Sequence, residues 1–346
     1  MKKLLLATAA ASMVAGPVAA QGIDFSGYAR FGFIYSEGAT GGFNNDEVST
    51  TSRFRLNMSA STETDFGATL SVIARAQADG GGATSFNAPR FTVSGGGLSV
   101  AVGNICGALE CMPGMYFGSR SAGLGVSGLG FHGMAANVSQ GNPGAGFFAW
   151  DAYSSNAAGA AANNGIELTY SFGDFSAHLS YSDRNPTAGT PATIVPLPPV
   201  LGGPVVVDPG TPGTARRERI AGHVAYTFDN FTYAIGFQDS DVAFEDKVII
   251  TVGGSFDAFR VNFQASDTRG IKKMVLAGSY DITPEATVLG FIGDESQNRA
   301  GFTQFNGTVA GVGLSYALGG GASIETGVVR TSDSNVLADF GMFFSF

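Results

Sequence analysis

Apolar and polar residues alternate along most of this chain. Between Ile23 and Tyr35 the odd-numbered residues are mostly apolar, among them Phe31 and Phe33, whereas the even-numbered ones include Asp24 and Arg30. The same period of two recurs in further segments, at residues 53–61, 68–77 and 336–346. Successive side chains of a β-strand point to opposite faces of a sheet. The pattern therefore predicts strands with one apolar face and one polar face.

Sixteen such strands are predicted, joined by tight turns that alternate with longer polar segments. Their expected positions are residues 23–36, 52–62, 67–77, 88–95, 97–103, 165–172, 175–183, 219–228, 231–239, 246–255, 258–265, 271–281, 286–294, 307–318, 322–331 and 335–346. Backbone polar groups cannot stay unpaired in lipid, so a membrane sheet must close on itself. The sequence predicts an all-β fold, a transmembrane antiparallel up-and-down β-barrel of 16 strands.

The first twenty residues have the layout of a secretory signal peptide. Lys2 and Lys3 precede an apolar run, and small residues at Val18 and Ala20 precede Gln21. The run is too short for a retained membrane helix. We therefore expect residues 1–20 to be a signal peptide and residues 21–346 to be one barrel in the outer membrane of a Gram-negative bacterium.

Two long insertions interrupt the strand rhythm. Residues 104–164 follow the fifth predicted strand and exceed the length of most loops. An inward-folding loop would narrow a water-filled lumen, so this segment is expected to constrict the pore. Residues 184–218 carry 8 of the chain's 13 prolines and are expected to form an extended external loop.

Composition narrows the possible functions. The chain has 51 glycines and 28 phenylalanines, only 14% charged residues, and a formal net charge of −9. A net negative charge argues against nucleic acid as a partner. No grouping of serine, histidine and carboxylate indicates an active site, so we do not expect an enzyme.

Four segments resemble general-diffusion porins, especially those of the alphaproteobacterial branch. They are "IDFSGYARFGFIY", "SRFRLNMSASTETDFGATL", "SYALGGGASIETGVV" and "SNVLADFGMFFSF". The resemblance implies a homotrimer of barrels whose third external loop folds into the pore. It also implies partners: outer-membrane lipid and lipopolysaccharide, small hydrophilic solutes and ions, and the barrel-assembly machinery. In that family the machinery reads the terminal phenylalanine, which Phe346, with Phe344 and Phe340, fits.

The resemblance also suggests where the pore narrows. Porin constrictions set carboxylates on the inserted loop against arginines on the opposite wall. The wall has matching residues at lumen-facing parity: Arg30, Arg53, Arg55, Arg75 and Arg90. The loop matches less well, since its charged residues are Glu110, Arg120 and Asp151. Net charge favours cations, whereas an arginine wall facing a nearly neutral loop weakens that preference or favours anions.

Cys106 and Cys111 lie near the start of the inserted loop. An oxidising periplasm favours a small disulfide between them, and two free thiols are the alternative. A metal site is disfavoured because the distant His132 does not complete a ligand set at a recognised spacing. Loop acids such as Asp46 and Glu47 could hold calcium, but such pairs are more often solvated charge, so no cofactor is expected.

The function expected from these features is passive diffusion of ions and small hydrophilic solutes through a water-filled channel. The alternative within the same fold is a substrate-specific channel with a binding site in its lumen. A barrel enzyme would need a catalytic grouping that the sequence does not show. A secreted β-sandwich would need polar residues on its outer faces.

Overall fold

A computed structural model describes residues 22–39, 46–80, 85–116, 164–184, 193–195, 206–208, 217–241, 246–297, 307–331 and 334–346. The first seven barrel strands are β1 (Asp24–Ser36), β2 (Val48–Glu63), β3 (Thr69–Asp79), β5 (Arg90–Gly95), β6 (Leu98–Gly103), β7 (Asn164–Phe172) and β8 (Phe175–Arg184). The other nine are β11 (Arg217–Phe228), β12 (Phe231–Ser240), β13 (Lys247–Phe256), β14 (Phe259–Thr268), β15 (Ile271–Asp281), β16 (Ala286–Gln297), β17 (Gly307–Gly319), β18 (Ala322–Arg330) and β19 (Val336–Ser345).

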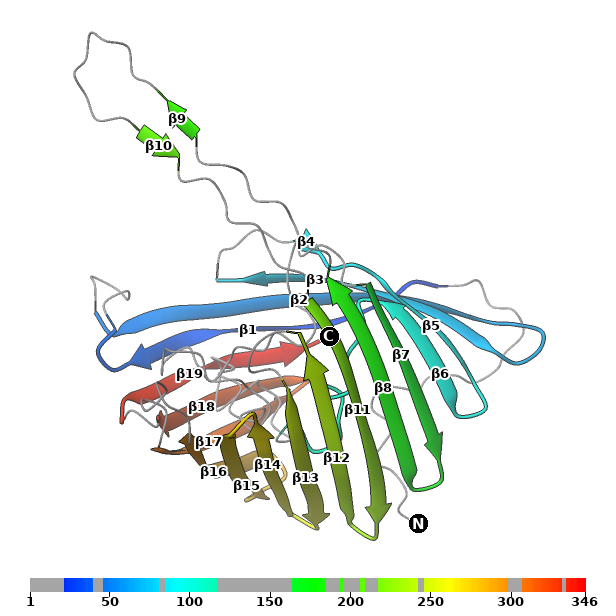
Figure 1. The fold of residues 1–346 in the computed structure, drawn as a ribbon. Helices are drawn as coiled ribbons and strands as arrows, with labels where there is room; N and C mark the ends of the chain where they lie inside the picture. Colours follow the sequence, from blue (N-terminus) through cyan, green and yellow to red (C-terminus); the bar gives the residue numbers. More distant parts are fainter. Residues whose placement is uncertain are drawn as a thin grey trace.

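These strands form a closed antiparallel barrel in which each strand pairs with its neighbours in the chain (Figure 1). The last strand pairs with the first, for example Phe340 with Phe33 and Met342 with Phe31, so the sheet has no free edge. Closure pairs the edge groups that would otherwise meet lipid. The predicted fold class and the sixteen barrel strands are confirmed.

The structure adds strands that the alternation did not predict. A two-residue strand, β4 (Ser85–Phe86), pairs with the end of β3. The short strands β9 (Thr193–Val195) and β10 (Val206–Asp208) pair with each other inside the proline-rich insertion and form a separate hairpin (Figure 1). Three residues per strand are too few for a period of two to stand out. The predicted signal peptide and most of residues 104–164 lie outside the described residues.

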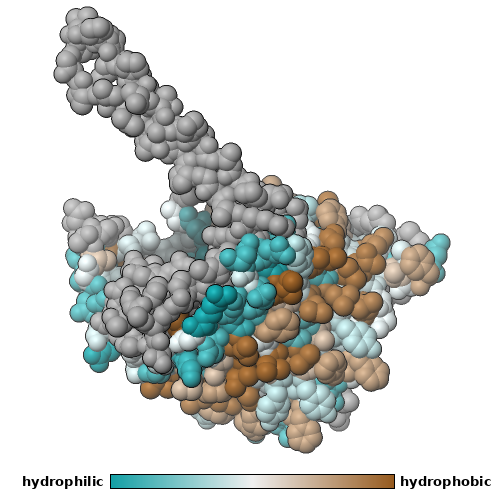
Figure 2. Space-filling model, viewed as in Figure 1, coloured by the Kyte–Doolittle hydropathy of each residue, from teal (hydrophilic) through white to brown (hydrophobic). Residues whose placement is uncertain are grey.

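The wall turns its apolar side chains outwards over most of its surface. On β1, Phe31 and Phe33 point outwards and are 52% and 51% exposed. The alternate positions point inwards, and Arg30, at one of them, is only 5% exposed. Figure 2 shows hydrophobic residues spread widely over the strands, with hydrophilic residues gathered beside them. No helix among the described residues is long and apolar enough to cross a membrane.

The inner face is less uniformly polar than the first strands suggest. On β15 to β19 it carries an apolar cluster, formed by Val275, Ala277, Leu289, Phe291, Val309 and Val329, with Leu337 packed against it. Where this cluster lies both faces of the strands are apolar, so the alternation that is clear in β1 to β3 weakens. The same strands also place Lys273, Glu325 and Asp339 on the inner side, so their inner face is mixed.

Phe346 joins the two ends of the barrel. Its backbone N–H donates to the Gly27 carbonyl at 3.1 Å, and the Gly27 N–H donates to the Phe346 carbonyl at 2.9 Å. The Phe346 ring lies over Gly27 and stacks on Phe54 at 6.0 Å between ring centroids. A Cβ added at Gly27 would lie 2.9 Å from Cζ of Phe346 and would clash with the Arg55 carbonyl oxygen. Only glycine fits at position 27, because no space is left there for a Cβ atom.

We predict that Gly27→Val destabilises the barrel at this junction. The branched side chain would push away the Phe346 ring and distort the pairing of β1 with β2, at a cost of about 1–3 kcal/mol for overpacking. The measurement is the temperature at which the folded band disappears in unboiled SDS electrophoresis. Gly290→Val is the control, because the nearest atom to its Cβ lies 3.8 Å away. Equal melting of the two variants would contradict the prediction.

Candidate functional site

Five arginines form a positive wall on one side of the lumen, and we call this set the arginine wall. It consists of Arg30, Arg53, Arg55, Arg75 and Arg90. They come from four neighbouring strands, β1, β2, β3 and β5, whose register places Arg30 opposite Arg53 and Arg75 opposite Asn57. Neighbouring strands are about 5 Å apart, so the guanidinium groups share one part of the lumen.

The partners of these arginines differ in charge. Arg53 forms an ion pair with Asp79, and Arg90 forms one with Glu167. Arg55 and Arg75 instead donate from Nε to neutral amides, those of Gln77 at 2.7 Å and Asn57 at 3.1 Å. The Arg55 guanidinium also lies 5.1 Å from the centre of the Tyr28 ring. These hydrogen bonds to amides hold the two side chains in place.

The first part of the inserted loop, residues 104–116, lies along the inner wall, and we call it the loop root. Its carbonyl oxygens accept hydrogen bonds from lumen-facing side chains on β13 and β14. Thr251 donates to Pro113 at 2.6 Å, Asn262 to Gly114 at 2.8 Å and Gln264 to Met115 at 2.7 Å. These side chains supply the backbone partners that a loop inside a barrel cannot obtain from a sheet.

Apolar packing also holds the loop root. Leu109, Met112 and Met115 are buried against small lumen-facing residues on β11 and β12, and against Ile249 on β13. A Cβ at Gly236 would lie 2.6 Å from Cδ2 of Leu109 and 2.8 Å from the sulfur of Met112. The glycine on β12 therefore makes room for the loop.

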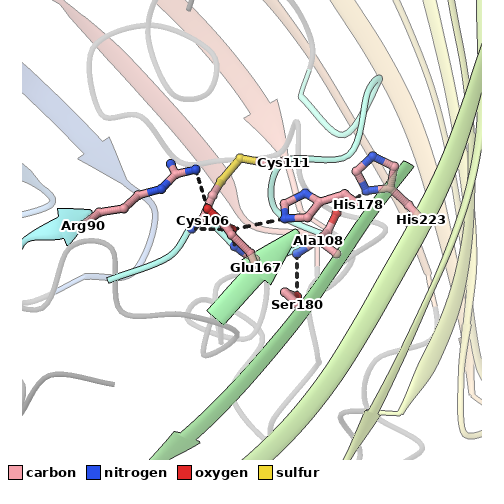
Figure 3. Close-up of a disulfide and its surroundings, with 9 residues drawn as sticks. Arg90, Cys106, Ala108, Cys111, Glu167, His178, Ser180 and His223 are labelled. Atoms are coloured by element: carbon pink, nitrogen blue, oxygen red, sulfur yellow. Dashed lines mark hydrogen bonds and ion pairs between the residues drawn. A yellow bond between two sulfur atoms is a disulfide. The ribbon is translucent and has the colours of Figure 1, made fainter. Parts of the chain in front are cut away.

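Glu167 on β7 anchors the start of the loop root (Figure 3). Its Oε2 accepts from the backbone N–H groups of Cys106 and Gly107, both at 3.1 Å, and lies 3.1 Å from Nε2 of His178. Its other oxygen forms the ion pair with Arg90. The carboxylate is 2% exposed, so its charge is compensated by these partners and not by water.

Two further contacts and a disulfide complete the anchor. Ser180 accepts from the Ala108 N–H at 2.9 Å, and the Ala108 carbonyl contacts Nδ1 of His223. Cys106 and Cys111 form a disulfide whose Cα atoms are 6.1 Å apart. The bond closes a tight ring in the backbone directly above Glu167 (Figure 3).

A cavity of about 200 Å³ lies between the arginine wall and the loop root. Arg55, Arg75 and Arg90 line it from the wall, and Glu110 and Cys106 from the loop. At the end of the loop root, Tyr116 is 44% exposed, and partial desolvation of its phenol inside the barrel, with the charge of Glu110, raises the pKa of that phenol. The phenol stays protonated at neutral pH and can donate a hydrogen bond.

The structure brings some of the expected site residues together. Arg55, Arg75, Arg90 and Glu110 line one cavity, and Arg30 and Arg53 lie opposite each other on β1 and β2, whereas Arg120 and Asp151 lie outside the described residues. Glu167 lies on the lumen side of β7, and its burial and four partners make it an anchor for the loop root. His223 contacts the Ala108 carbonyl of the loop root, whereas His178 contacts Glu167. Their lumen-facing parity on adjacent strands was the only signal available.

Metal-binding groups are not assembled in the described part of the chain, where no three of histidine, cysteine, aspartate and glutamate lie close enough to hold an ion. Phe340, Phe344 and Phe346 all point outwards and are 57%, 41% and 52% exposed. Their rings therefore belong to the membrane-facing surface and take no part in the lumen.

Comparison with known proteins agrees with this geometry. The chain matches the family model described as Gram-negative porin over residues 7–336. A protein named porin from Fuscovulum blasticum is 30% identical over 335 residues, covering 94% of this chain and 100% of that protein. Two engineered variants of Rh. blastica porin have solved structures similar to this one, with TM-scores of 0.67 and 0.66 at 25% identity, each covering 94% of this chain and 100% of theirs.

The predicted family and outer-membrane location are confirmed by these matches, and so is the prediction that the chain is a channel and not an enzyme. A closed wall with an apolar exterior and a charged lumen is the arrangement that passive passage of ions and small solutes requires. The chain belongs to the Gram-negative porin family and is a general-diffusion channel of the outer membrane.

Proposed function

We propose that solutes are selected where the arginine wall faces the loop root. Five arginines on neighbouring strands carry this proposal, because the loop root narrows the lumen beside them. Passage is diffusive, and solutes are selected by the width of the gap and by the electric field across it.

The same arrangement gives the constriction a preference for anions. Asp79 and Glu167 pair with Arg53 and Arg90, Glu110 lies on the facing side of the cavity, and Asp339 lies near Arg30. The five arginines of the wall therefore exceed these four carboxylates by one positive charge. A local field acts on an ion at short range, so it outweighs the net charge of −9 spread over the whole chain.

A substrate-specific channel is the second candidate. The cavity of about 200 Å³ beside Arg55, Arg75 and Arg90 has the size and charge for a small carboxylate or phosphate. Conductance that one such anion blocks in a saturable manner would favour this reading over simple diffusion.

The proposed partners are a second and third copy of the chain, lipopolysaccharide and the barrel-assembly machinery; no cofactor is expected. A groove of about 450 Å³ on the outer face supports the homotrimer. It lies beside the β1–β19 junction, between Ala29, Ala78 and the rings of Phe31, Phe54 and Phe344. Small residues framed by aromatic rings suit insertion of a side chain from a neighbouring copy.

We predict that the double variant Arg55→Gln, Arg75→Gln loses anion preference. In water a unit charge acts on an ion a few ångströms away with roughly 0.5–1 kcal/mol, so removing two should lower the anion-to-cation permeability ratio several-fold at low salt. The measurement is the reversal potential in a planar bilayer under a KCl gradient.

Arg260→Gln is the matched control for this experiment. Arg260 faces the lumen on β14 and pairs with Asp281, and it is not among the residues that line the cavity beside the arginine wall. A wild-type channel selective for cations, or equal shifts in both variants, would refute the proposal. A pure protein that never raises bilayer conductance would contradict channel function itself.

We predict that Glu167→Gln loosens the loop root. The amide leaves Arg90 without its carboxylate, and breaking such a buried pair costs about 3–5 kcal/mol. The amide protons of Cys106 and Gly107 should then exchange faster by mass spectrometry, with noisier open-channel current. Glu325→Gln is the control, since Glu325 is also buried in the wall but accepts from Ser315 and Ser323. Unchanged exchange in Glu167→Gln would show that this carboxylate does not anchor the loop.

We predict that Phe346→Ala lowers the amount of barrel in the outer membrane more than it impairs folding. Recognition by the assembly machinery is lost in cells, whereas refolding of purified protein in detergent should be slowed less. Phe228→Ala removes another outward-facing ring, 66% exposed, and serves as the control. If refolding and cellular yield fall by the same factor, Phe346 acts through packing alone.

A further inference from the structure

A third cavity, of about 410 Å³, lies on the outer wall at β13 to β16. Its lining includes Val248, Ile250, Met274, Asp267, Lys272 and Asp294. These six residues occupy outward-facing positions of their strands. The residues at the alternate positions point inwards, and two of them, Ile249 and Lys273, are 0% and 1% exposed. Ser266 and Lys273, at inward positions, also line the cavity, but its other eight lining residues are at outward positions, so the cavity lies mainly on the membrane side. We call it the rim groove.

The rim groove crosses the level at which the outer wall changes from polar to apolar. Along β15 the outward residues run from Lys272 near the loop end to Met274 and Leu276, and along β16 from Asp294 to Ile292. The floor is formed by Val248, Ile250 and Met274, which are 50%, 42% and 55% exposed. A groove that is charged at one end and apolar at the other matches an amphiphile lying in the membrane interface.

The charges at the upper end include both signs. Lys272 is paired in register with Asp267 on β14, and Asp294 on β16 lies opposite Met274, the next outward residue. Asp267 accepts from the Gly270 N–H at 2.8 Å, and Asp294 from the Thr308 hydroxyl at 3.3 Å. Within the described residues Lys272 forms no ion pair. One ammonium thus lies between two carboxylates, each of which keeps oxygen lone pairs available.

We propose that the rim groove binds one phospholipid whose headgroup carries both a phosphate and a primary ammonium. The phosphate lies on Lys272, the ammonium donates to Asp267 and Asp294, and an acyl chain covers Val248, Ile250 and Met274. An anionic headgroup without an amine would face two uncompensated carboxylates. A quaternary ammonium would have the charge but no N–H to donate.

Native mass spectrometry of delipidated protein in detergent tests this assignment. Short-chain phosphatidylethanolamine, phosphatidylglycerol and phosphatidylcholine are titrated separately, without divalent cations. We expect one phosphatidylethanolamine to bind roughly ten-fold more tightly than the other two lipids, the factor expected for one charge-assisted hydrogen bond. Lys272→Ala and the double variant Asp267→Asn, Asp294→Asn should each abolish this difference.

Asp239→Asn is the matched control. Asp239 is an exposed carboxylate with outward parity on β12, and it is not among the residues lining the rim groove. Retention of the lipid preference in this variant supports the assignment. Equal binding of all three lipids, tighter binding of phosphatidylglycerol, or a preference that survives Lys272→Ala would overturn it. Bilayer conductance is measured separately, so failure of this proposal does not affect the proposed selectivity.

Discussion

Pairing of backbone hydrogen-bonding groups is the constraint on which this structure depends. In hydrocarbon an unpaired N–H or C=O costs several kcal/mol, so a sheet can span the membrane only when its first and last strands meet. Here β1 pairs with β19, and Phe346 continues that pairing with Gly27. The aromatic C-terminus thus forms part of the wall, and its ring covers the glycine that makes the junction possible.

The loop root obeys the same constraint inside the barrel. It leaves the sheet after β6, so its backbone groups need other partners, and lumen-facing side chains on β7, β8, β11, β13 and β14 supply them. Glu167 has a central place because it satisfies two backbone N–H groups and compensates Arg90 together. The residues that position the loop therefore also decide how much of the arginine charge reaches the pore.

Several features followed from the sequence, and particular residues show why others did not. The alternation around Arg30 and Phe31 predicted which face of each strand meets lipid, since the period of a strand is two whatever its neighbours are. The same rule puts Glu167 and His178 at lumen-facing positions of β7 and β8. It could not show that Cys106, Gly107 and Ala108 lie against them, because that contact joins residues about sixty or more positions apart. The sequence also did not predict the apolar cluster around Val275 and Phe291 on the inner face, because polar and apolar residues do not alternate where both faces of a strand are apolar.

The sequence by itself determined the class of the fold, the sixteen barrel strands and the family, because these depend on local periodicity and on recurring segments. Only the tertiary structure decided which charges remain active at the constriction and where an outward groove lies at the membrane boundary. Both depend on the register between strands and on the path of the loop root. The register and the path of the loop root are set by contacts between residues far apart in the sequence, and a periodic pattern along the chain does not report such contacts.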